Sequence, residues 1–438
     1  MSDPPDSGRP SPRTAGRRQI ISWALWDFGA TGLNAVVVTF VFSIYLTNTV
    51  GADLPGDISA TSWLGWALGA AGLAVALLAP VTGVWVDAPW RRRRVLAVLS
   101  VTAVVLISAM SLVRDDYRYL ALGLVLLGCA SACNELATVP YNAMLRQLST
   151  PQTSGQISGF GLGLGYFGSV TLLLVVYLGF ISGDGGMLGL PVEDGQNVRA
   201  AMVFTAVWFG LFAVPVLLAV PSVRPGPVEQ QRRVGFVGGY RKLWTDIRSE
   251  WRRDHNVVYY LIASAVFRDG LTGIFAFGAV LGVRVYGVSE ADVLLFGVSA
   301  STIAAVGAVL GGLLDDRFGA KPVIVVSLAA MIGVGLTLMA LNGALAFWLC
   351  GLALCLFIGP TLSAARTLML RMSAHGKEGV AFGLYTTTGR AVSYLAPFLF
   401  SLFIAVFGTD RAGMGGLVVV LAAGLLAMLA VRVPRAPG

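Results

Sequence analysis

Twelve long apolar runs dominate the chain and constrain its fold more than any other feature. Each run has about the 20 residues that an α-helix needs to cross the hydrocarbon core of a bilayer. Only 12% of the residues are charged, against about 25% in soluble domains. We therefore expect an all-α polytopic membrane protein. The runs lie near residues 20–47, 61–86, 94–113, 119–146, 156–181, 200–220, 256–283, 292–314, 322–341, 344–370, 379–407 and 413–432.

The longest polar connection divides these runs into six and six. We expect a first six-helix bundle over 20–220, a linker over 221–254 and a second bundle over 255–432. Ser, Pro and Arg are abundant in residues 1–19, which predicts a disordered tail, and residues 433–438 form a second tail. In the linker, apolar residues recur at helical spacing among basic ones, which predicts an amphipathic helix on the membrane surface: Tyr240, Leu243, Trp244, Ile247 and Trp251.

The distribution of basic residues predicts the orientation of the chain. Most of the 31 Lys and Arg residues fall in the tails, the linker and alternate connections, including the run 91–94. Basic residues are enriched on the cytoplasmic side of membrane proteins. We therefore expect both termini to be cytoplasmic. The remaining connections hold few basic residues, namely Arg114, Arg118, Arg199, Arg284 and Arg411.

Several polar and charged side chains lie within the runs and are candidate solute or coupling residues. Trp23, Asp27, Thr31 and Asn34 share one helical face of the first run. A charge inside the hydrocarbon core is costly, so it faces a partner or a cavity. The sequence leaves open interhelical ion pairs and a transport path, and Arg366 is the expected partner of Asp27. The candidates are Asp27, Asn34, Glu135, Thr138, Asn142, Arg268, Asp269, Arg366 and Arg390.

The two halves of the chain repeat each other. Residues 83–92 correspond to 312–321, and Asp27 corresponds to Asp269. Repeated halves are typical of secondary transporters with a midplane site. We expect Asp87 to pair with Arg146, and Asp316 with Arg371, and to close the inner side. The candidate gating residues are Gly83, Asp87, Arg91, Arg146, Gly312, Asp316, Arg317, Gly319, Lys321 and Arg371.

A glycine-rich stretch over 155–168 indicates close packing between helices. It lies within an apolar run and follows no strand, so it is not a phosphate loop. Small residues at four-residue spacing let two helices approach closely. The eighth run also carries glycines, namely Gly297, Gly307 and Gly311.

Several motifs resemble known families. The sequence GLLDDRFGAK at 312–321 is similar to the loop signature of the major facilitator superfamily, and the copy at 83–92 keeps Gly83, Asp87 and the arginines. WALWDFG at 23–29, VPYNAML at 139–145, GQISGFGLGLGYFG at 155–168 and FRDG at 267–270 resemble the vacuole-effluxer family. The resemblance implies two pseudo-symmetric six-helix bundles and a cavity lined by the first, fourth, seventh and tenth spans. It also implies that the fifth span packs near the eighth and that fungal members export amino acids.

We expect a secondary transporter that moves a small polar solute by alternating access, is coupled to protons and favours efflux of an amino-acid-like substrate. Carboxylates in desolvated sites can carry protons. The alternatives are a melibiose-type sugar–cation symporter, an exporter of apolar drugs or lipids, and a non-transporting membrane receptor or chaperone.

No nucleophile–base pair, nucleotide motif or metal constellation is evident in the sequence, so we expect no enzyme activity, no cofactor and no metal. The expected partners are the solute, the lipid bilayer and protons, with no nucleic acid. We expect a monomer in the bacterial inner membrane.

Overall fold

The computed structural model of the chain describes residues 15–183, 185–220 and 254–433. Between 220 and 254 it describes only positions 238, 241, 245 and 248. The amphipathic helix expected at Tyr240–Trp251 and the tails 1–14 and 434–438 otherwise lie outside the described residues.

Twelve helical segments of the described chain are long and apolar enough to cross a membrane, six before residue 220 and six after residue 254. The twelve runs expected from hydropathy are therefore confirmed. The first helix begins at Arg17, so part of the expected tail 1–19 is helical. In the first half the helices are α1 (Arg17–Leu33), α2 (Phe42–Tyr45), α3 (Ala60–Val86), α4 (Pro89–Ala109), α5 (Leu120–Leu148), α6 (Ser154–Val176) and α7 (Gln196–Ala219).

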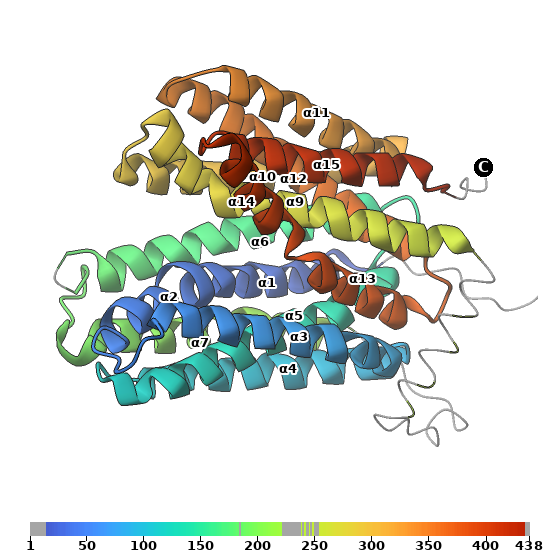
Figure 1. Ribbon diagram of the computed structural model, residues 1–438. Coiled ribbons are helices and arrows are strands. Elements are labelled where there is room, and N and C mark those ends of the chain that lie inside the picture. The colour runs from blue at the N-terminus through green and yellow to red at the C-terminus, as the bar shows by residue number, and fades with distance from the viewer. Residues whose placement is uncertain are drawn as a thin grey trace, which may run out of the picture.

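The second half repeats this arrangement. Its helices are α9 (His255–Tyr286), α10 (Glu290–Phe318), α11 (Ala320–Ala340), α12 (Ala344–Met372), α13 (Glu378–Val392), α14 (Leu395–Phe407) and α15 (Ala412–Ala430). Figure 1 shows α1 to α7 in one bundle and α9 to α12 with α15 in the other.

Two spans are interrupted, which hydropathy did not predict. The first span passes from α1 through a wider helical turn at Asn34–Phe40 into α2. The eleventh span is divided at Ser393 and Tyr394 into α13 and α14. In Figure 1, α13 lies beside α3, whereas α14 turns away toward α15. α13 therefore contacts α3 of the first half as well as α9 of its own half, whereas α14 packs on α9 and α15 of its own half.

The bundles meet along two pairs of helices with small residues at the contact, α6 with α10 and α3 with α13. Gly163 of α6 faces Ala305 of α10, where a Cβ atom at Gly163 would lie 2.9 Å from the Ala305 carbonyl oxygen. The predicted packing of the fifth span on the eighth is confirmed.

The glycines predicted for the eighth span are not the ones in that contact. Gly312 and Ala308 face α6, whereas Gly307 and Gly311 face Pro360 of α12 and Gly297 faces open space. The reason is the helical rotation of about 100° per residue, which turns neighbouring glycines toward different partners.

The helices define two ends of the molecule. We call the end with the turns at 87–89, 149–153, 319 and 373–377 the signature end, and the other the opposite end.

Candidate functional site

The signature end is closed by carboxylates that bind the starts of helices in the other half. The Asp87 carboxylate accepts a hydrogen bond of 3.0 Å from the Val380 N–H at the start of α13. The Asp316 carboxylate accepts bonds of 2.7 and 2.8 Å from the N–H groups of Gly155 and Gln156 at the start of α6. The first turn of a helix carries unsatisfied donors and partial positive charge, which favours these contacts.

The arginines of the repeat differ in their partners. Arg371 pairs with Asp316 at 3.2 Å, as expected, and with Asp315 at 2.5 Å. Arg146 pairs with Glu378 at 3.1 Å. The predicted pair of Arg146 with Asp87 is therefore wrong. The reason is that Glu378, at the start of α13, places a carboxylate beside Arg146.

Arg92 and Glu378 are residues of this closure that sequence reasoning missed. The Arg92 side chain is only 2% exposed and pairs with Glu378 at 2.9 Å. It also donates to the carbonyl oxygens of Val86 and Ala143. The prediction named the neighbouring Arg91, which is partly buried with its guanidinium 6.0 Å from the Trp90 ring centroid. The repeat could have identified Arg92, because it stands where the second half has Lys321.

Other predicted gating residues lie in different surroundings. Gly83 faces Gly379 and Gly312 faces Gly155 across the two contacts between halves. Lys321 donates to the carbonyl oxygens of Leu429 and Val431 at the end of α15. Arg317 is exposed beside the ring of Phe318, and Gly319 adopts a φ of 91° in the turn between α10 and α11. Lys321 and Arg317 thus lie away from the contacts between halves.

Asp27 and Arg366 meet between the halves, as expected. The carboxylate of Asp27 on α1 lies 3.4 Å from the Nη2 atom of Arg366 on α12, and it accepts a bond of 3.1 Å from the Thr31 hydroxyl. Gly165 of α6 lies against this carboxylate, since a Cβ atom there would lie 3.2 Å from the Asp27 Cγ atom. Asp27 is 8% exposed, so the pair lies in a largely enclosed space.

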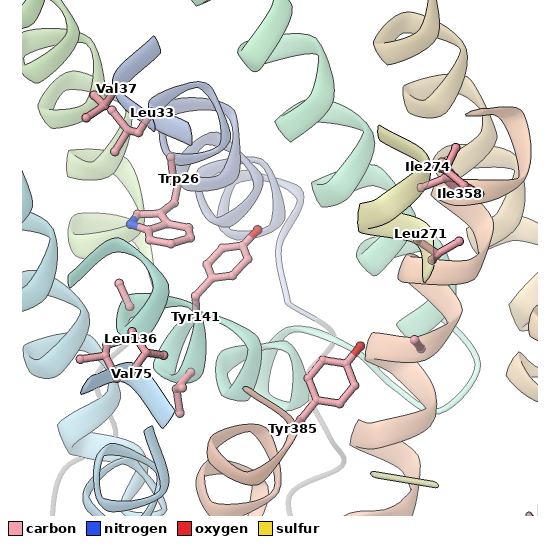
Figure 2. Close-up of a cluster of buried hydrophobic side chains, with 14 of the residues drawn as sticks. Trp26, Leu33, Val37, Val75, Leu136, Tyr141, Leu271, Ile274, Ile358 and Tyr385 are labelled. Carbon is pink, nitrogen blue, oxygen red and sulfur yellow. The ribbon is translucent and has the colours of Figure 1, made fainter. Parts of the chain in front are cut away.

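Three aromatic rings form one wall of this space. Tyr141 stacks on Trp23 and on Trp26, with 4.4 Å between centroids in both pairs. Figure 2 shows the ring of Trp26 beside that of Tyr141. The Arg366 guanidinium carbon lies 5.8 Å from the Trp23 centroid and 5.6 Å from the Tyr141 centroid. These distances permit cation–π attraction. Tyr141 is not among the candidate residues predicted from the sequence.

Two polar atoms at this wall lack partners. The Tyr141 hydroxyl and the Nη1 atom of Arg366 are buried, and neither has a hydrogen-bond partner among the described residues. Gly161 of α6 packs closely against this wall, since a Cβ atom there would lie 2.5 Å from the Trp23 ring and 3.3 Å from the Tyr141 hydroxyl. Leaving a buried polar group unsatisfied costs about 1–3 kcal/mol. A polar ligand at this position would remove that cost.

Glu135 and Arg390 form a second pair between the halves. The Nε atom of Arg390 on α13 lies 2.6 and 2.7 Å from the two carboxylate oxygens of Glu135 on α5, and Nη2 also contacts the carboxylate. Both side chains are partly exposed. Thr138 donates its hydroxyl to the Glu135 carbonyl, Asn142 is buried, and Asn34 is exposed.

Arg268 and Asp269 remain within the second half. Arg268 donates a bond of 3.0 Å to the Tyr385 carbonyl and lies 3.8 Å from the centroid of that ring. The Asp269 carboxylate accepts a bond of 2.6 Å from the Ala396 N–H of α14. Of the six intramembrane charges, four therefore join the halves in two pairs. The other two, Arg268 and Asp269 of α9, contact the two parts of the broken eleventh span.

No group of three or more His, Cys, Asp or Glu side chains in the described part of the chain could hold a metal ion. The site therefore consists of paired charges, unpartnered donors and aromatic rings between two bundles.

The fold and this site define an integral membrane transporter of the major facilitator superfamily, which is not an enzyme. The model of the family "Vacuole effluxer Atg22 like" matches residues 15–437, and the chain belongs to this family. The uncharacterized MFS-type transporter YxiO of Bacillus subtilis is 20% identical over 93% of this chain and 94% of its own length.

Autophagy-related protein 22 of Yarrowia lipolytica is 25% identical over 57% of this chain. The match spans 46% of that fungal relative's length. Among solved structures, the proton:xylose symporter XylE has a TM-score of 0.68 at 15% identity, covering 94% of this chain and 93% of its own. At this identity the likeness shows the fold alone.

Proposed function

We propose that the protein is a proton-coupled secondary transporter of an amino-acid-like zwitterion, which binds at the Asp27–Arg366 pair. The observation that carries this proposal is the pair itself, long at 3.4 Å and lying between the halves beside two unpartnered donors. A solute carboxylate accepts from Arg366 Nη1 and the Tyr141 hydroxyl. The solute ammonium group takes the place of the guanidinium beside Asp27. Bidentate charge-assisted bonds of this kind are among the strongest in proteins.

The solute-binding step also supplies a reason for movement. Asp27 and Arg366 belong to different halves, so a solute that bridges them favours a state in which the halves approach around it. A ligand shifts a conformational equilibrium only by its difference in affinity for the two states. The closed signature end must then open, which breaks the Asp87–Val380 and Asp316–Gly155 contacts.

Asp27 and Glu135 are the carboxylates that we assign to proton coupling. Both lie between the halves, and each faces a single arginine, Arg366 or Arg390. A carboxylate that loses its arginine when the halves separate is left without a compensating charge, and binding a proton then removes its own charge. In the coupled cycle the charge of the same carboxylate is therefore compensated by its arginine in one state and by a bound proton in the other.

The proposal includes topology and assembly. In the proposed topology the signature end and both termini are cytoplasmic, which the basic residues of the alternate connections support. The protein then lies in the bacterial inner membrane as a monomer, with the halves divided at 221–254 and no nucleic-acid partner. Efflux is the favoured direction, by analogy with the vacuole effluxers named above.

Liposomes containing Asp27→Asn or Glu135→Gln protein provide the test of coupling. We expect amino-acid movement driven by a pH gradient to fall at least tenfold in one of these variants, while solute exchange without a gradient persists. The control is Asp53→Asn, an exposed carboxylate of the opposite end. Wild-type pH dependence in both site variants would remove the coupling assignment.

A thermal-shift screen of the purified protein against amino acids, sugars and apolar compounds tests the solute class, because a bound ligand raises apparent stability by mass action. A shift with sugars and stimulation by sodium would favour a sugar–cation symporter instead.

Export of apolar solutes is a second candidate, favoured by an open pocket of about 820 Å³ lined by α3, α5 and residues 54–58. Its lining is largely apolar and includes Trp63, Trp66, Ala70, Leu124 and Ala132. A shift with apolar compounds alone in the same screen would support this candidate.

A further inference from the structure

The break in the eleventh span separates a docked segment from an undocked one. Along α13, Gly379 faces Gly83 of α3, Gly383 faces Ala79, and the Arg390 side chain reaches Gly72. The two helices thus run antiparallel in a regular register up to the last turn of α13. Beyond Ser393 the contact ends, because α14 turns toward α15 (Figure 1).

The face of α3 that contacts α13 continues past the break. Gly69 and Gly65 follow Gly72 along α3 at helical spacing, and a Cβ atom at either would meet no atom within 4 Å. The register of α13 on α3, extended into α14, brings Tyr394 to Gly69 and Phe398 to Gly65. Both aromatic residues are now exposed, Tyr394 to 68% and Phe398 to 58%. An uncovered glycine face therefore lies in line with an undocked apolar helix of the same span.

Asp269 satisfies the start of α14 in the broken form. The residue before α14 is Tyr394, whose side chain provides no cap for the free N–H groups of the first turn. The Asp269 carboxylate on α9 accepts from the N–H of Ala396, the second residue of α14, at 2.6 Å. Gly273 permits this approach, since a Cβ atom there would lie 2.9 Å from the Ala396 Cβ atom.

A straight eleventh span would use a different acceptor for the same N–H group. In a continuous helix the Ala396 N–H bonds to the carbonyl four residues back, which belongs to Val392. Pro397 has no N–H, and its ring opposes the carbonyl of Ser393, so the span bends easily at this point. The Asp269 carboxylate and the Val392 carbonyl therefore compete for one donor. The partial positive charge at a helix N-terminus attracts the negative carboxylate, which favours Asp269 over the Val392 carbonyl as the acceptor.

We propose that Asp269 is a positioning residue that holds α14 away from α3, and that α14, once released, docks on the Gly65–Gly69 face and closes the opposite end. This assignment goes beyond the proposed solute site, because it concerns a residue that contacts α14 and not the space beside Arg366. It also differs from the expectation that Asp269 binds solute or protons.

Disulfide formation in proteoliposomes without added solute tests whether Asp269 holds α14 away from α3. The native cysteines Cys129, Cys133, Cys350 and Cys355 are first replaced by alanine, since all are free thiols. The pair Gly69→Cys with Tyr394→Cys reports docking of α14. Asp269→Ala is expected to raise the rate of disulfide formation in this pair about 5- to 30-fold, the effect of losing one charged cap. Asp269→Asn retains an acceptor oxygen and should give a smaller rise.

The pair Ala76→Cys with Thr387→Cys is the matched control, because the Thr387 hydroxyl already bonds the Ala76 carbonyl in the docked segment. Its rate should not change in Asp269→Ala. An unchanged rate in the pair Gly69→Cys with Tyr394→Cys would overturn the proposal. An equal rise in both cysteine pairs would also overturn it, because it would indicate a general loosening of the helices. Neither result depends on which solute is carried.

A bulky residue on the glycine face supplies an independent check. Gly69→Trp should lower the rate of disulfide formation between Gly65→Cys and Phe398→Cys at least fivefold, because the indole occupies the face of α3 on which α14 docks. Gly333→Trp is the control, since Gly333 of α11 also faces open space. Equal rates in the two variants would show that α14 does not dock on α3.

Discussion

Arg366→Met is expected to abolish transport and to lower the free energy of unfolding by about 3–5 kcal/mol, because removing one partner leaves the buried Asp27 carboxylate uncompensated. Methionine keeps much of the side-chain volume, so the loss reports the charge rather than a cavity. Denaturant unfolding in detergent and transport in liposomes measure the two effects. Arg317→Met, at an exposed arginine, is the matched control and should change stability by less than about 0.5 kcal/mol.

Charge reversal then separates a solute-binding pair from a purely mechanical one. The double variant Asp27→Arg with Arg366→Asp restores an ion pair between α1 and α12. If the pair binds solute, stability should recover while transport stays absent, because the stacked rings of Trp23 and Tyr141 then face a carboxylate. Recovery of transport as well would favour a gate between the halves and would contradict the solute-binding assignment.

Glu378→Gln is expected to open the signature end. The buried Glu378 carboxylate contacts the guanidinium groups of both Arg92 and Arg146. The uncharged glutamine leaves two cations close together, one of them almost fully buried. Breaking a buried charge pair costs about 3–5 kcal/mol, and 3 kcal/mol corresponds to a shift of more than 100-fold in the equilibrium between closed and open forms.

Alkylation of a cysteine at Ala79 measures this shift, because Ala79 is fully buried against α13 when the end is closed. Glu378→Gln should raise its alkylation rate, whereas Asp292→Asn at an exposed carboxylate should not. An unchanged rate in a folded Glu378→Gln protein would show that other contacts hold the end closed.

The repeat in the sequence predicted the acids at the signature end but not all of their partners. Asp87 and Asp316 both bind the start of a helix in the other half, as their equivalent positions suggest. Their arginines differ, because α13 begins with Glu378 where α6 begins with Ser154. Arg146 forms an ion pair with Glu378. Arg371 instead pairs with Asp315 and Asp316 and donates a hydrogen bond to the Ser154 hydroxyl. Two differences between the repeats, Ser154 against Glu378 and Val86 against Asp315, thus account for the different ion pairs.

The intramembrane acids show a similar limit. Asp27 and Asp269 occupy equivalent positions, yet Asp27 faces an arginine of the other half and Asp269 faces a backbone N–H of its own half. The cause is the break at Ser393, which frees the first turn of α14 beside α9. Pro397 is the residue that could have indicated this break, since proline weakens a helix in the turn before it.

Hydropathy and charge in the sequence determined the twelve spans, the division into halves and the list of buried charges, because each follows from the cost of placing polar groups in lipid. The tertiary structure alone decided which charges meet, that Tyr141 stacks between Trp23 and Trp26, and that α14 leaves α3. Those outcomes depend on helix rotation and on contacts between residues more than 100 positions apart, which local spacing does not encode.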